Sequence, residues 1–153
     1  MAVAAEEIYS LLIPLELERL VVPRSCVAEV IRYAEPSEGE ADHWLRGFVT
    51  WNNLKIPVVS VEMLSGINVP VPAGRTRIVV IHPVSGGDLG PYGILAEGFP
   101  QMVRISREVL ELDKTYTPPA DAPLISRVSL LHEQALIPDL DMLEQQLLEA
   151  LPA

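Results

Sequence analysis

Short apolar runs separated by prolines dominate the chain. The runs richest in valine, isoleucine and leucine lie at residues 8–13, 27–33, 48–51, 56–61, 77–81 and 102–105. The 14 prolines are spread along most of the chain, and each removes a backbone donor and disfavours a helix. Short β-branched segments bounded by turn residues are typical of strands. The pattern therefore predicts a mainly β protein, built as a small barrel or sandwich.

Two segments depart from this pattern and predict helices. Residues 60–66 form one or two helical turns in this interpretation, with Ser60 as the N-cap and Gly66 as the stop. In residues 139–151, Asp141 and Glu144 have the spacing of a capping box. The leucines of this segment fall on one helical face, at Leu140, Leu143, Leu147 and Leu151. We expect a surface helix that docks through this leucine stripe.

The chain also contains an internal repeat. Residues 49–51 resemble residues 128–130, and residues 61–64 resemble residues 140–143, in both cases at an offset of 79 residues. Nearer the start of each half, residues 30–32 resemble residues 102–104, at an offset of 72. Short apolar strands also resemble one another by chance, but here the matches recur in the same order.

The repeat predicts two pseudo-equivalent small barrels. The first barrel is expected at about residues 8–66 and the second at about residues 76–138, followed by the helix at about residues 139–151. The stretch 66–75 contains proline and glycine and is expected to join the two halves.

Composition and charge exclude several classes of protein. The 153 residues include 21 Asp and Glu against 11 Lys and Arg, which gives a formal net charge of −10. This charge repels nucleic acid and anionic lipid. A lone cysteine, Cys26, cannot form an internal disulfide, and the N-terminus lacks the basic and long apolar regions of a signal peptide. We expect a soluble, cytoplasmic protein without direct membrane insertion.

No combination of residues suggests catalysis. The sequence has no phosphate-binding loop, zinc-binding helix motif or nucleophile elbow, and the glycine-rich residues 85–91 are expected to form a hairpin loop. An enzyme would require His43, His82, His132 and Cys26 to converge in space. Asp139 and Asp141 are better explained by the start of a helix than by a metal site. We therefore predict no catalytic residue, no metal site and no cofactor.

Several motifs together resemble the CheW-like chemotaxis adaptors. Residues 27–32, Val-Ala-Glu-Val-Ile-Arg, resemble the family's "V-x-E-I-I-R" strand. Residues 45–51 and 56–61 are similar to its "G-V-x-x-x-R-G-x-x-I-P-V-I-D-L" block. Residues 93–97 and 103–105 are similar to its "G-L-L-V-D-x-V" and "V-L-R-I" strands. The resemblance runs from about Ile8 to about Leu148.

This resemblance implies a fold, a function and partners. The fold would be two SH3-like five-stranded β-barrel subdomains, packed with pseudo-twofold symmetry and closed by a C-terminal helix. The function would be that of a non-catalytic adaptor. Its partners would be the cytoplasmic tips of chemoreceptors and the regulatory domain of a CheA-type histidine kinase, which has the same fold.

The resemblance also implies partner-binding residues. Val27 and Glu29 match positions associated with receptor and kinase coupling, and Gly47 begins the diagnostic block. Strand alternation predicts that Glu29 is exposed, whereas Val27 is equally compatible with a core position. Gly47 is also explained by a strand bend or a close backbone approach.

The chain departs from the family pattern at two points. Asn52 and Asn53 stand where the family usually has Arg-Gly, so Asn52 is a fourth candidate contact that lacks the arginine's charge. Asparagine tolerates positive φ, so the tight turn is expected to survive. Ser60 replaces the usual aspartate. These changes favour a specialised adaptor. The alternative is a small-ligand-binding or regulatory β-barrel protein without a chemotaxis partner.

Overall fold

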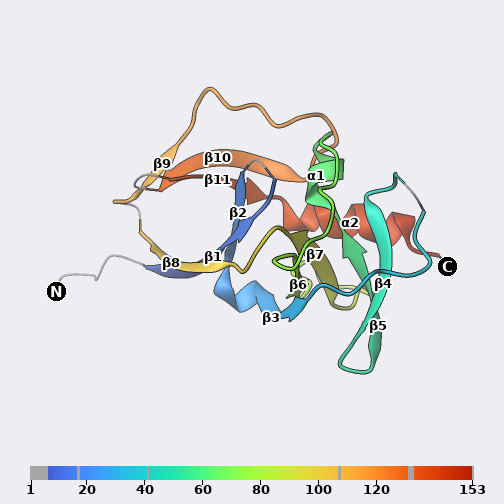
Figure 1. The fold of residues 1–153 in the computed structure, drawn as a ribbon. Coiled ribbons are helices and arrows are strands. Elements are labelled where there is room, and N and C mark those ends of the chain that lie inside the picture. The colour runs from blue at the N-terminus through green and yellow to red at the C-terminus, as the bar shows by residue number, and fades with distance from the viewer. Residues whose placement is uncertain (1–6, 17, 41, 107, 131–132, 153) are drawn as a thin grey trace.

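The computed structural model of the chain describes residues 7–16, 18–40, 42–106, 108–130 and 133–152 (Figure 1). Within these ranges the chain is mainly β, as predicted. The strands are β1 (Ile8–Pro14), β2 (Arg19–Pro23), β3 (Val27–Arg32), β4 (Leu45–Trp51), β5 (Leu54–Val59), β6 (Arg77–Ile81), β7 (Tyr92–Ala96), β8 (Gln101–Ile105), β9 (Leu110–Leu112), β10 (Leu124–Leu130) and β11 (Glu133–Pro138). The helical elements are a 3₁₀ turn, η1 (Arg24–Cys26), and the helices α1 (Val61–Leu64) and α2 (Leu140–Ala150).

The described strands form two sheets that lie side by side in Figure 1. The six-stranded sheet has the order β8-β1-β2-β11-β10-β9, and the five-stranded sheet has the order β3-β6-β7-β5-β4. Most neighbours are antiparallel, but β11 pairs with β2, and β5 with β7, in parallel. The edge strands are therefore β8 and β9 in one sheet and β3 and β4 in the other.

Each sheet takes strands from both halves of the chain. β1 and β2 join the six-stranded sheet, whereas β3, β4 and β5 join the five-stranded sheet with β6 and β7. The segments 8–66 and 76–138 are therefore not separate sheets. The physical reason is that hairpin β1–β2 pairs with β8 and β11, and hairpin β6–β7 pairs with β3 and β5.

The strand order nevertheless confirms the repeat. In the repeat, strands β1 to β5 correspond in order to β6, β7, β8, β10 and β11. Exchanging each strand for its counterpart turns the order β3-β6-β7-β5-β4 into β8-β1-β2-β11-β10. This is the order of the other sheet without β9. Local details also recur at the offset of 79 residues. The β4–β5 ladder shifts register between Leu45 and Gly47, and the β10–β11 ladder shifts between Leu124 and Ser126.

The core has three apolar layers that follow this arrangement. One lies within the five-stranded sheet and includes Ile56, Val58 and Ile78, and one lies within the six-stranded sheet and includes Leu12 and Val128. The third and largest joins the two sheets to α2. Successive residues of β6 alternate between layers, with Ile78 and Val80 in one and Val79 and Ile81 in another. The strand period of two therefore buries both faces of this strand.

Both predicted helices are present, but the capping of α2 differs from the expectation. Ser60 caps α1 by accepting a hydrogen bond from Met63 N at 3.2 Å, as predicted. Asp139 caps α2 by accepting from Met142 N at 3.0 Å. The predicted capping box of Asp141 and Glu144 is therefore wrong. The N-cap is Asp139, two residues before Asp141. Glu144 therefore lies in the second turn of the helix, where it is fully buried.

Candidate partner-binding surfaces

Val27 and Glu29 lie on β3, an edge strand of the five-stranded sheet. Glu29 is exposed, as predicted, whereas Val27 is half-buried and packs against the largest apolar layer. The β3–β6 ladder shifts register between these two residues, since Val27 pairs with Ile81 and Glu29 with Val80. Such a bulge on an edge strand locally re-aims side chains. Glu29 is thus available to a partner, and Val27 is partly so.

Gly47 lies on β4, at the opposite edge of the same sheet. It is buried, with a φ of +125°. A Cβ atom at this position would lie 2.4 Å from the carbonyl oxygen of Ser37. Both the backbone conformation and the close approach therefore require glycine. Gly47 shapes the edge of the sheet but has no side chain to offer.

Asn52 forms the tip of the β4–β5 hairpin together with Asn53. Their φ values are +50° and +61°, and both residues are exposed. Two successive residues with positive φ are typical of a type I′ hairpin turn, which asparagine tolerates. The predicted tight turn is confirmed. The four candidate residues do not form one site, because Val27 and Glu29 lie at one edge of the sheet and Gly47 and Asn52 at the other.

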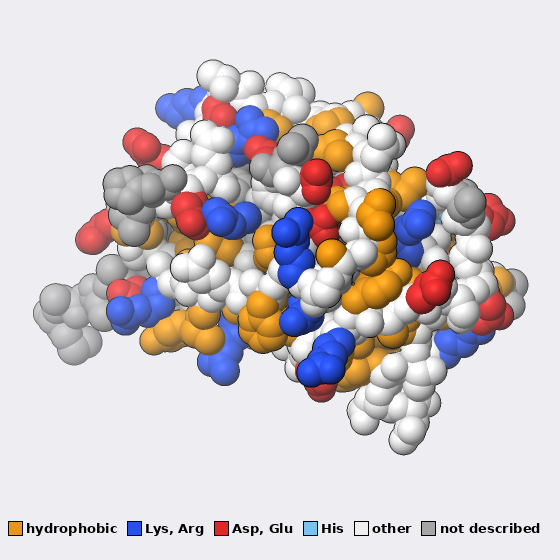
Figure 2. Space-filling model, in the orientation of Figure 1, with side chains coloured by type: hydrophobic (Ala, Val, Ile, Leu, Met, Phe, Trp, Pro, Cys, Tyr) orange, Lys and Arg blue, Asp and Glu red, His pale blue; other side chains and the backbone are white. Residues whose placement is uncertain are grey.

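An exposed apolar surface lies on β1, on β8 and just before β8, and was not singled out in the sequence. Its members are Tyr9 on β1, Met102 on β8 and Phe99 just before β8, with exposed fractions of 50%, 51% and 69%. We call these three residues the β1–β8 surface. β1 and β8 are adjacent strands, and η1 contacts β1 and leads directly into Val27. Figure 2 shows apolar side chains grouped on this side of the molecule, with charged side chains between them.

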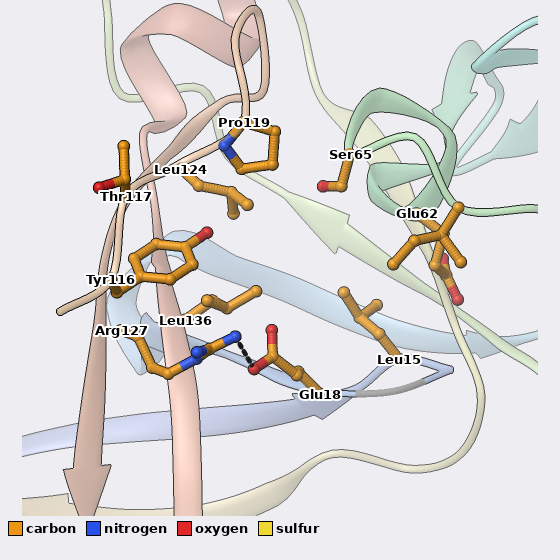
Figure 3. A pocket seen from close by; sticks show the side chains of 11 residues that line it. Leu15, Glu18, Glu62, Ser65, Tyr116, Thr117, Pro119, Leu124, Arg127 and Leu136 are labelled. Carbon is orange, nitrogen blue, oxygen red and sulfur yellow. Dashed lines mark ion pairs between the residues drawn. The ribbon is translucent and has the colours of Figure 1, made fainter. Parts of the chain in front are cut away.

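A separate pocket of about 470 Å³ lies between α1 and strands β10 and β11 of the six-stranded sheet (Figure 3). Tyr116 and Arg127 stand on one wall, and Leu15 and Glu62 on the other. Arg127 forms an ion pair with Glu18 at 2.6 Å and lies over the ring of Tyr116 at 4.6 Å from its centroid. None of the residues predicted to bind partners lines this pocket.

Glu62 is the buried acidic group of this pocket. Its side chain is 3% exposed, and its Oε2 accepts a hydrogen bond from Glu16 N at 3.1 Å. Burial raises the pKa of Glu62 to about 7, and the nearby Glu97 and Glu16 add to the increase. The burial of Glu62 could not be predicted from the sequence, because a glutamate in a short helix ordinarily faces solvent.

Three of the residues that an enzyme would need, His43, His82 and Cys26, take ordinary structural positions. His43 Nδ1 accepts a hydrogen bond from Leu45 N at 3.0 Å, and His82 is exposed just after β6. Burial raises the pKa of the Cys26 thiol, which disfavours the reactive thiolate. His132 lies outside the described residues. Among the described residues, no group of three or more His, Cys, Asp or Glu side chains is arranged to hold a metal ion.

A scan against protein-family models matches residues 10–147 to the CheW-like domain. The chain belongs to the CheW-like family. The recognition of this family from the strand motifs is thus confirmed, as is the fold that it implied.

A solved structure supports the fold of this CheW-like domain. The chain is similar to the crystal structure of scaffolding protein TtCheW from Thermoanaerobacter tengcongensis, with a TM-score of 0.73 and 15% sequence identity. The match covers 90% of this chain and 88% of that chain. At this identity the likeness establishes the two-subdomain, SH3-like fold. A search of curated proteins finds no significant match.

The helices of the CheW-like domain are short. Among the residues that the structure describes, none forms a helix long and apolar enough to span a bilayer.

Proposed function

We propose that this CheW-like domain is a non-catalytic, cytoplasmic adaptor that couples chemoreceptors to a CheA-type histidine kinase. Family membership supports the role of an adaptor in chemosensory signalling. The observation that carries the proposal is the position of Glu29 and Val27 on an edge strand that η1, in contact with β1, joins to the β1–β8 surface.

The chemistry of this surface suits an amphipathic helix at a receptor tip. The apolar side chains of Tyr9, Phe99 and Met102 would contact the apolar face of such a helix. The charges of Glu29 and Arg104 would set its register and disfavour other partners. The kinase regulatory domain would bind at another edge of the sheets, where unpaired backbone groups are available for pairing with a related barrel.

Binding to the regulatory domain of the CheA-type kinase from the same cell tests the proposal, with isothermal titration calorimetry as the measurement. Val27→Arg/Glu29→Lys is expected to weaken receptor binding in the ternary complex at least tenfold, whereas the kinase domain, which binds at another edge, should still bind. Glu29→Lys alone is measured as well, because Val27 contacts the core and its replacement also affects folding.

The matched control carries the same two charges at exposed positions elsewhere. Val71 is 87% exposed and Glu149 lies on the outer face of α2, so Val71→Arg/Glu149→Lys should bind like the natural chain. If neither the kinase domain nor a receptor tip binds at high micromolar concentration, the adaptor proposal fails and the alternative of a ligand-binding β-barrel gains support.

A further inference from the structure

Glu62 lies where three parts of the fold meet. It belongs to α1, and its Oε2 accepts a hydrogen bond from Glu16 N, in the turn between β1 and β2, at 3.1 Å. Glu97, just after β7, is the third carboxyl group of this cluster, since its charge and that of Glu16 both act on Glu62. Glu62 is buried, whereas Glu16 is exposed, and Figure 3 shows Glu62 on the wall of the pocket. Water is therefore close to a carboxyl group that is itself buried.

The buried position suits a protonated Glu62 better than a charged one. A carboxylate can accept about four hydrogen bonds. The described residues supply one donor from outside α1, Glu16 N, and no ion pair. Burial raises the pKa of Glu62 to about 7, and repulsion from Glu97 and Glu16 adds to the increase. Holding an ionised Glu62 in this place is therefore costly.

The other charged groups nearby act on different partners. Glu18, in the same turn, pairs with Arg127 of β10 at 2.6 Å. Burial raises the pKa of Glu97, whereas Arg75, shortly before β6, lowers it. Tyr116, on the opposite wall of the pocket, remains a neutral phenol because burial raises its pKa. Both arginines thus act on carboxyl groups outside α1.

The turn that Glu62 holds also supports the segment that leads to Phe99. Pro14 ends β1 at this turn, and its carbonyl oxygen accepts a hydrogen bond from Glu97 N at 2.8 Å. Phe99 follows two residues later and belongs to the β1–β8 surface. A change at Glu62 therefore has a hydrogen-bonded path, through the turn, to an exposed apolar side chain.

We propose that Glu62 and the β1–β2 turn form a proton-sensitive latch. With Glu62 protonated the latch is closed. When Glu62 ionises, its carboxylate leaves the buried position for solvent and gives up the hydrogen bond with Glu16 N. The turn and the segment from Glu97 to Phe99 then become more mobile. The latch is a property of the isolated chain, so it stands independently of the proposed coupling to receptor and kinase.

The size of the effect follows from proton linkage. In the open form Glu62 regains its ordinary pKa of 4.5, whereas in the closed form burial raises the pKa to about 7. The closed form therefore binds the proton more tightly, and the ratio of open to closed molecules rises with pH, by about tenfold between pH 6 and pH 8. Below pH 4.5 both forms are protonated, and the ratio no longer depends on pH.

Hydrogen exchange of single backbone amides, followed by NMR on the full chain, tests the latch. After division by the intrinsic rate at each pH, the protection of Glu16 N should fall about tenfold between pH 6 and pH 8. Glu97 N should lose protection over the same range. In Glu62→Gln, whose side chain still accepts from Glu16 N but cannot ionise, the protection of both amides should stay constant.

Low urea distinguishes the latch from global unfolding. Amides that exchange through local opening are insensitive to low urea, whereas amides that need global unfolding lose protection with it. Glu16 N should be insensitive, and Val79 N, in the core strand β6, should respond. An equal response of the two amides would overturn the latch.

Glu149→Gln, at an exposed position of α2, is the matched control and should show the pH profile of the natural chain. Unchanged protection of Glu16 N between pH 6 and pH 8 would contradict the latch, as would the same loss in Glu62→Gln. A carbon-13 NMR titration that places the pKa of Glu62 near its ordinary value of 4.5 would contradict it too.

Discussion

Glu62 and Glu144 are buried carboxylates with very different surroundings. Glu144 receives hydrogen bonds from Val84 N, Ser85 N, Ser85 Oγ and the Tyr92 hydroxyl. Glu62 receives one from Glu16 N. Burial therefore raises the pKa of Glu62 from its ordinary value of 4.5 to about 7. A carboxylate with few donors is costly to bury in its charged form.

The pH dependence of stability follows from this pKa. Between pH 4.5 and 7 the folded state binds the Glu62 proton more tightly than the unfolded state, so the free energy of unfolding falls as pH rises. Glu62→Gln cannot ionise and still accepts from Glu16 N. We expect it to be more stable than the natural chain by about 1–3 kcal/mol at pH 8, with the difference vanishing near pH 4.

Urea denaturation of both chains across this pH range measures the effect. Glu149→Gln, on the exposed face of α2, is the matched control and should follow the natural chain at every pH. A constant difference between the Glu62→Gln variant and the natural chain at all pH values would contradict ionisation as the cause.

At the scale of elements, α2 and the β6–β7 loop act as one unit. The Tyr92 hydroxyl donates to Glu144 at 2.8 Å, and burial and this bond both raise the pKa of Tyr92, which stays protonated as a donor. Ser85 N donates to the same carboxylate at 2.8 Å. The glycine-rich loop predicted at residues 85–91 is therefore anchored at its start by a helix from the end of the chain.

Removing this anchor should destabilise the fold. Glu144→Ala leaves the buried Tyr92 hydroxyl and the partly buried donors of Val84 and Ser85 without this partner, and we expect a loss of about 2–4 kcal/mol in the free energy of unfolding. Glu149→Ala, five residues later and on the exposed face of α2, should change stability by less than about 0.5 kcal/mol. Equal effects of the two substitutions in urea denaturation would show that the carboxylate network contributes nothing specific.

Local features of the elements could be predicted from sequence because they depend on near neighbours. The N-cap at Ser60, the turn at Asn52 and Asn53, and the exposure of Glu29 follow from residue type and strand period. The role of Glu144 could not be predicted, because its partners lie 52 to 60 residues away along the chain. A glutamate three residues after an aspartate has the same pattern whether it caps a helix or anchors a distant loop.

For the whole molecule, the repeat was visible in the sequence but the exchange of strands between its halves was not. Offsets of 72 and 79 residues reveal which strands are equivalent. They are compatible both with one sheet per half and with sheets that take strands from both halves. The choice between them depends on pairings such as Leu20 with Leu136 and Val58 with Gly93. These contacts join distant segments, and strand periodicity alone does not encode them.

Cutting the linker between the halves tests this exchange. A protease site inserted after Val71, which is 87% exposed, should be cleaved without loss of the folded state, because strand pairing holds the pieces together. After separation in urea, each piece alone should lack the circular dichroism of a folded sheet, and mixing should restore it. Independent folding of either piece would contradict the exchange of strands as a requirement for stability.

The exchange of strands also determines what the linker does for the molecule. Two unlinked halves would associate by mass action, and the folded fraction would then rise and fall with protein concentration. Because the linker from Gly66 to Arg75 joins the two halves, each half meets the other at a fixed effective concentration, which the short length of the linker sets. The folded fraction of this protein is therefore the same at low and at high protein concentration.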